Sequence, residues 1–224
     1  MNSNRKSYSW QRVNCSYEKG LYMRIERVES LDKRKCKVFT DEDFAFLLYN
    51  GELEKYGVCE GAVLEERTER ELLDLLSRRA HERALNLLKV QDRTEGEMCR
   101  RLFQDGYPDS IVQETIGFLQ EYHFVDDARY AANYLQVHGK RKSQAELKLY
   151  LQRKGISREI IREQLEETEH DSGEAIRVLL EKKHYRAGET APEEEKKIIA
   201  YLMRRGFSWE DIRREMKKQE EALG

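Results

Sequence analysis

The 224-residue chain has few helix-interrupting residues, because it contains only two prolines, while 38% of its residues are charged. It lacks an apolar run long enough to cross a membrane and a segment with the features of a signal peptide. Its high charge density, with abundant Glu, Lys, Arg, Leu and Ala, favours helices exposed on one side over one globule with a deep core. The sequence therefore predicts a mainly α, soluble protein of the cytoplasm.

The chain also lacks the residue clusters that bind metals or catalyse reactions. Its histidines stand singly, and no CxxC spacing occurs among its four cysteines, Cys15, Cys36, Cys59 and Cys99. The absence of a CxxC spacing favours reduced thiols that are buried or half-buried. A Gly-rich phosphate loop, an HExxH helix and a nucleophile elbow are all missing. We therefore predict neither catalysis nor a bound metal or cofactor.

An excess of positive charge is missing as well. The net charge is −2, which disfavours a protein that coats nucleic acid by charge alone. The N-terminal charges are nevertheless uneven: residues 1–39 hold ten Lys or Arg against four acids, and residues 40–76 hold three against eleven. These two segments are expected either to pair with each other or to present faces of opposite charge.

Period-two alternation marks the region before about residue 65. Short apolar or alternating runs at 22–30, 35–40 and 43–51 predict strands, and 52–57 predicts one helical turn that ends at Gly57. We predict a small strand-containing N-terminal domain over residues 21–65. Residues 1–20 are polar and basic, which predicts a disordered tail.

From Glu66 onward the apolar period becomes 3.6, and one turn pattern recurs three times. A leucine lies four residues before a glycine, and a large apolar residue follows the glycine at once, at Gly106, Gly155 and Gly206. The spacings are 49 and 51 residues, which indicates an internal repeat. A glycine in the left-handed conformation closes a helix, and the apolar residue after it folds back on the last turn.

Helix-start signals surround each turn. Thr94-x-x-Glu97 and Ser143-x-x-Glu146 have the form of capping boxes, and Thr190-Ala-Pro-Glu193 is a looser version. After each turn, Pro108-Asp109, Ser157 or Ser208 is expected to start the next helix.

With an apolar helical stretch before each box, these signals predict a repeated unit of three helices. The fold is therefore three tandem three-helix repeats, over residues 66–127, 128–170 and 171–224, in an elongated curved array after the N-terminal domain. Neighbouring repeats are expected to share apolar faces.

The paired carboxyls Asp126 and Asp127 are the best candidates for acid–base chemistry. Their setting, "HFVDDARYAANYL", places both at the start of a helix, where carboxylates cap free N–H groups and complement the helix dipole. We therefore interpret them as capping residues.

Basic residues recur just before the turns and are better candidates for a binding surface. Repeats in register would bring these basic residues to one side, where they would meet phosphates or an acidic protein groove. Each basic residue alone fits equally well as a solvated cation at the end of a helix. The candidate filament- or DNA-binding residues are Arg100, Arg101, Lys140, Arg141, Lys142, Arg153, Lys154, Arg204 and Arg205.

The helical region resembles the RecX family of bacterial recombinase regulators over about residues 75 to 219. The resemblance is carried by Arg93-Thr94-x-x-Glu97-Met98, Leu102-x-x-x-Gly106-Tyr107, Phe124-Val125-Asp126-Asp127-Ala128-Arg129-Tyr130-Ala131 and Lys154-Gly155-Ile156. Asp105, Tyr150 and Asp211 depart from the family pattern. The resemblance therefore specifies the fold more firmly than it specifies the third repeat or the residues that contact a partner's groove.

The resemblance implies a non-enzymatic modulator that lies along the groove of the RecA nucleoprotein filament. Such proteins typically inhibit ATP hydrolysis and strand exchange by RecA, and many have some affinity for single- or double-stranded DNA. The implied setting is DNA recombination and repair in the SOS response, with the protein acting as a monomer.

Two other functions fit the same residues. Helix-turn-helix DNA readers are also built from tri-helical units, and they predict binding with a steep salt dependence. A helical-repeat scaffold for an unrelated protein is the third hypothesis.

Overall fold

The structure is a computed structural model that describes residues 23–41, 45–168 and 172–222. The predicted disordered tail, residues 1–20, lies outside these residues. The chain divides into two compact units between Leu72 and Leu73. In the described part of the chain, none of the helices has the length and apolar character needed to span a membrane.

The N-terminal unit contains an antiparallel sheet of three strands in the order β1-β2-β3. The strands are β1 Ile25–Ser30, β2 Lys35–Thr40 and β3 Ala45–Tyr49, and a short helix follows, α1 Asn50–Tyr56. Gly57 ends α1 in the left-handed conformation, as predicted. The strand-containing N-terminal region expected from period-two alternation is therefore confirmed.

Alternation along β2 decides which face of the sheet is buried. Cys36, Val38 and Thr40 are buried, whereas the residues between them are half-buried. Phe46 and Leu48 of β3 are also buried and pair in register with Val38 and Cys36. The unit thus has one apolar face and one open face.

The cysteines differ in exposure, which corrects the prediction that all of them are buried or half-buried. Cys36 and Cys99 are buried, but Cys59 is exposed, because it lies in the loop after α1 and not on the buried face of an element. Cys15 lies outside the described residues. Burial, reinforced by the nearby carboxylates of Glu95 and Asp109, raises the pKa of Cys99 to about 11.

This difference predicts selective labelling of the folded protein. At pH 8 a thiol reagent should modify Cys59 at least about a hundredfold faster than Cys99, because only the exposed thiolate is reactive. Peptide mass spectrometry at successive times would measure both rates, with the denatured protein as the control in which they converge. Equal rates in the folded protein would contradict the burial of Cys99.

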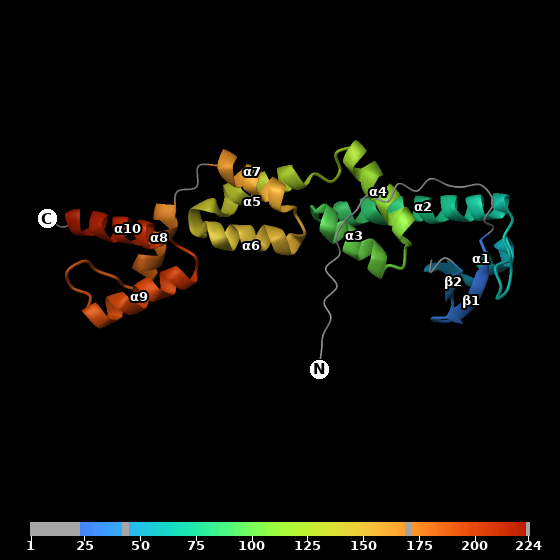
Figure 1. Cartoon of the computed structure of the whole chain (residues 1–224), viewed down its shortest axis with the longest axis horizontal. Coiled ribbons are helices and arrows are strands. Elements are labelled where there is room, and N and C mark those ends of the chain that lie inside the picture. The colour runs from blue at the N-terminus through green and yellow to red at the C-terminus, as the bar shows by residue number, and fades with distance from the viewer. Residues whose placement is uncertain (1–22, 42–44, 169–171, 223–224) are drawn as a thin grey trace. The chain divides into compact units, whose positions relative to one another are not determined.

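Helices α2 to α10 follow one another along the chain in three groups of three, as predicted (Figure 1). The first group is α2 Glu66–Leu88, α3 Glu95–Gln104 and α4 Asp109–Glu121. The second is α5 Asp127–His138, α6 Gln144–Lys154 and α7 Arg158–Glu167, with a short 3-10 helix, η1 Gly139–Arg141, between α5 and α6. The third is α8 Ser172–Lys182, α9 Pro192–Arg204 and α10 Trp209–Glu221.

Each group of helices has its own apolar core. The first core includes Met98, Leu102 and Ile116, the second includes Leu147 and Leu151, and the third is built in the same way from α8, α9 and α10. Each buried cluster draws its residues from one repeat. This differs from the expectation that neighbouring repeats share an apolar face, since the contacts recorded where repeats meet are largely polar.

All three predicted glycine turns are present. The φ angles are 85° at Gly106, 95° at Gly155 and 88° at Gly206, in the left-handed region. In each turn the residue after the glycine donates its N–H to the carbonyl of the repeat leucine five residues earlier, at 3.1, 3.2 and 3.3 Å. These are Schellman motifs, which satisfy helix carbonyls that otherwise have no partner.

Two of the three predicted capping boxes are present, at Thr94 and Ser143. Ser157 and Ser208 also cap their helices. The third box, at Thr190, was predicted wrongly. Helix α9 starts instead from Ala191 with Pro192 as its first residue, and its first turn therefore needs one N–H partner fewer.

Candidate functional site: cations at the repeat junctions

The first and second repeats meet where the start of α3 contacts the end of α6. The Thr94 hydroxyl donates a hydrogen bond of 2.6 Å to the carbonyl oxygen of Lys154, and Lys154 Nζ donates one of 2.7 Å to Glu97 Oε1. Gly96 and Gly155 lie against each other, since a Cβ added to either would lie 3.0 Å from the Cα of the other. We call these contacts joint 1.

The second and third repeats meet through the equivalent residues. Ser143 Oγ donates a hydrogen bond to the carbonyl oxygen of Arg205, and Glu146 Oε1 accepts from Nε and Nη2 of Arg205 at 2.9 and 2.8 Å. Ala145 takes the place that glycine has in joint 1, and its Cβ would lie 2.4 Å from a Cβ on Gly206. We call these contacts joint 2.

The capping-box glutamates serve two repeats at once. Oε2 of Glu97 and of Glu146 accepts the N-cap N–H of its own helix, while Oε1 binds the cation of the next repeat. Burial opposes the charged form of Lys154, but its hydrogen bond and ion pair with Glu97 outweigh this and raise the pKa of Lys154. Lys154 and Arg205 are therefore held in place as charged partners within the chain.

A tyrosine accompanies the cation at both joints. Lys154 Nζ lies 5.5 Å from the centre of the Tyr150 ring, and Arg205 donates to the Tyr201 hydroxyl at 3.2 Å. Both tyrosines lie five residues before the repeat glycine and are 51 residues apart, the same spacing as Gly155 and Gly206. This spacing is visible in the sequence, although the pattern of basic residues does not reveal it.

Most of the predicted binding residues are occupied by contacts within the chain. Arg100 Nη2 donates to the carbonyl oxygen of Lys154 at 3.2 Å, so Arg100 belongs to joint 1. Lys142 donates to the Tyr134 hydroxyl and lies over the stacked rings of Tyr134 and Tyr150. Lys140 makes a long ion pair of 3.8 Å with a glutamate at the start of α8.

The first repeat departs from the predicted register. Arg100 and Arg101 lie about one helical turn before the position that Arg153 and Lys154 occupy in the second repeat, where the first repeat has Gln104 and Asp105. Asp105 forms ion pairs with Arg83 at 2.6 Å and Arg101 at 3.2 Å. The first repeat therefore has an acid where the other two repeats have the cation of a joint.

Five of the predicted residues are exposed. Two of these, Arg100 and Lys140, have the contacts just described, and the other three are Arg141, Arg153 and Arg204. In the described part of the chain, none of the three has a recorded hydrogen bond or ion pair. Arg153 and Arg204 each immediately precede the cation of a joint, so they occupy equivalent positions in two repeats that are joined in the same way. We call Arg153 and Arg204 the cation row.

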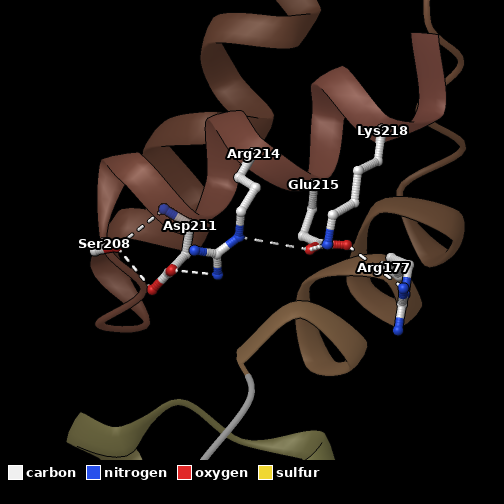
Figure 2. Close-up of polar contacts among 6 residues, drawn as sticks. All are labelled: Arg177, Ser208, Asp211, Arg214, Glu215 and Lys218. Atoms are coloured by element: carbon white, nitrogen blue, oxygen red, sulfur yellow. Dashed lines mark hydrogen bonds and ion pairs between the residues drawn. The ribbon is translucent and has the colours of Figure 1, made fainter. Parts of the chain in front are cut away.

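A further group of cations on the third repeat was not predicted. Figure 2 shows Arg177 of α8 with Arg214 and Lys218 of α10 around the carboxylate of Glu215. Glu215 is fully buried, whereas each of the three cations has about half of its side chain exposed. The closest contact joins Lys218 Nζ and Glu215 Oε1 at 2.6 Å. The buried carboxylate thus orders three surface cations and links α8 to α10.

The paired acids at the start of α5 have separate structural roles. Asp126 caps α5 by accepting from the Arg129 N–H at 2.8 Å, as predicted. Asp127 lies in the first turn of α5, but its carboxylate accepts from the Glu95 N–H at the start of α3, at 2.9 Å. Burial raises the pKa of both the Asp127 and Glu95 carboxyls, and the charge of Asp127 raises the pKa of Glu95 further.

These raised pKa values predict a pH-dependent effect of Glu95→Gln. Because both carboxyls bind protons more tightly in the folded state, their contribution to stability decreases as pH rises above about 4, through the raised pKa values. Glu95→Gln should therefore raise the free energy of unfolding by about 0.5 kcal/mol at pH 7 and by less at pH 4. Denaturant unfolding at both pH values measures this, with the exposed Glu166→Gln as a control that should show no such gain.

Groups of three or more His, Cys, Asp or Glu side chains able to hold a metal ion do not occur among the described residues. The described residues instead present exposed guanidinium groups on a frame whose junctions are fixed by partly buried polar contacts.

Family models of the three RecX three-helix domains match this chain in order. The first domain matches residues 80–119, the second 126–165 and the third 171–216. Together these matches cover more than half of the chain and coincide with the three groups of helices.

Relatives called "Regulatory protein RecX" are similar to the chain. The protein of Clostridium tetani is 31% identical over 139 residues, 60% of this chain and 64% of that protein. The protein of Clostridium acetobutylicum is 27% identical over 197 residues, 84% of this chain and 92% of that protein.

Two crystal structures share the fold. One, of a regulatory protein RecX, has a TM-score of 0.59 at 22% identity and covers 87% of this chain and 99% of its own. The other, of RecX from Lactobacillus salivarius, has a TM-score of 0.56 at 21% identity and covers 65% of this chain and 97% of its own.

Proposed function

Because this chain belongs to the RecX family of regulatory proteins, we propose that it binds the RecA nucleoprotein filament along its groove and inhibits ATP hydrolysis and strand exchange. It acts without catalysis of its own, as a monomer in the cytoplasm, during recombination and DNA repair in the SOS response. The limits of the repeats, 66–127, 128–170 and 171–224, are part of this proposal.

The observation that carries the proposal is the cation row. A filament presents the same surface at regular intervals, so a ligand that follows it needs equivalent groups at a regular spacing. Arg153 and Arg204 are exposed and are set in two repeats by equivalent joints. They would meet acidic side chains or phosphates of the groove, where complementary charge increases the association rate and fixes the register.

The test is the single-stranded-DNA-dependent ATPase of the cognate recombinase. Substoichiometric amounts of this protein should lower the rate of ATP hydrolysis, because one molecule in the groove contacts several recombinase subunits. An unchanged rate at saturating protein would reject the proposal.

Direct DNA binding by the helical repeats has less support. Lys154 and Arg205, which this alternative needs for phosphate contacts, are bound to Glu97 and Glu146. Gel-shift assays without recombinase separate the two functions, since a DNA reader binds its sequence unaided and with a steep salt dependence.

A further inference from the structure

The N-terminal sheet has an open face that the proposed function does not use. This face carries Arg27 of β1, Lys35, Lys37 and Phe39 of β2, and Tyr49 at the end of β3, and we call it the open sheet face. Arg27 lies directly opposite Phe39, and Lys35 lies directly opposite Tyr49. One cation–aromatic pair therefore joins β1 to β2 and another joins β2 to β3, and the row between the two pairs holds Glu29, Lys37 and Leu47.

The side chains on this face are in contact. Arg27 Cζ lies 4.2 Å and Lys37 Nζ 4.8 Å from the centre of the Phe39 ring, and Lys35 Nζ lies 5.5 Å from the centre of the Tyr49 ring. In such pairs a cation lies at the face of the ring. Tyr49 is 44% exposed, so part of its ring is accessible to a ligand.

Positive charge predominates on the open sheet face. Its acidic member is Glu29, which forms an ion pair with Arg27 at 3.0 Å. The carboxylate of Asp32, in the turn before β2, accepts the N–H groups of Arg34 and Lys35 at 2.7 and 2.9 Å and so serves the backbone. Within the described residues, Lys35 and Lys37 have no recorded ion pair, so their charges are available to a ligand.

We propose that the open sheet face binds single-stranded nucleic acid. Unpaired bases stack on Phe39 and Tyr49, while Lys35 and Lys37 move from the rings to the phosphates. The two rings are offset by about 13 Å along the strands, so they would hold bases at separate positions of one strand. We favour a single strand over an acidic protein surface, because each nucleotide offers both a base for a ring and a phosphate for the lysine beside it.

Fluorescence anisotropy of a labelled oligothymidylate with the full chain, without recombinase, tests this site. Lys35→Glu/Lys37→Glu should weaken binding at least about tenfold and reduce the salt slope by about 1.4, the loss of two single-strand phosphate contacts. The control is Arg67→Glu/Arg70→Glu on the exposed side of α2, which changes the net charge equally. It should alter affinity less than about twofold.

Two further measurements use the unsubstituted protein and do not depend on variant folding. A 5-iododeoxyuridine oligonucleotide should crosslink to the peptides that contain Phe39 or Tyr49, and crosslinks confined to the helical repeats would overturn the proposal. A duplex of equal length should bind more weakly, because its paired bases cannot stack on Phe39 and Tyr49. Equal affinity for the duplex would contradict this stacking.

The inference also has a specific rival outcome. If Lys35→Glu/Lys37→Glu leaves oligonucleotide binding unchanged but weakens binding to the recombinase, the face docks a protein and the proposal is wrong. Failure of the ATPase test alone would not affect it, because these measurements contain no recombinase.

Discussion

Gly206→Ala should lower the free energy of unfolding by about 2–5 kcal/mol, the largest stability effect that we expect from removing or adding one methyl group. The left-handed conformation of Gly206 costs an alanine about 1–2 kcal/mol. Its new Cβ would also lie 2.4 Å from the Cβ of Ala145, and overpacking of this kind typically costs about 1–3 kcal/mol. Denaturant unfolding monitored by circular dichroism measures the loss.

Two variants separate these contributions. Gly188→Ala lies in the same repeat with φ of 75° and no atom within 4 Å of the added Cβ, so it should show the conformational cost alone. Adding Ala145→Gly to Gly206→Ala removes the overlapping methyl group and should recover part of the loss. If the double variant is no more stable than Gly206→Ala, joint 2 is not packed as described.

Arg153→Glu/Arg204→Glu should raise the concentration needed to inhibit the recombinase ATPase by half at least about tenfold. A tenfold change corresponds to about 1.4 kcal/mol, and placing like charges opposite each other at an interface costs that much or more. Both residues are exposed and have no recorded partner among the described residues, so the loss of stability should come from placing acids in the last turns of α6 and α9, about 1–2 kcal/mol in total.

The matched control is Arg162→Glu/Arg213→Glu. Arg162 and Arg213 are exposed, lie in the same two repeats and share a repeat position, seven residues after the glycine. The control therefore makes the same change in net charge on different helices, α7 and α10. Equal loss of inhibition in the two double variants would show that only net charge matters, which contradicts a role for the cation row.

Features that depend on a few neighbouring residues were predictable from the sequence. The glycine turns close through hydrogen bonds that span at most five residues, and the serine and threonine caps act on an N–H three residues away. The third capping box failed for a similarly local reason, since Pro192 supplies a different helix start.

The use of the basic residues was not predictable in this way. Thr94 and Lys154 are 60 residues apart, and their contact exists only when two repeats pack against each other. The sequence showed Lys154 and Arg153 as neighbours of the same charge. The structure binds the first to Glu97 and leaves the second exposed.

By itself the sequence determined the helical repeat, the positions of its turns and the family, because helix periodicity, left-handed glycines and caps act within about two turns of chain. Only the tertiary structure decided which cations join the repeats and which face outward. Two adjacent residues on a helix point about 100° apart, so the packing of a distant repeat against one side chain leaves its neighbour in solvent.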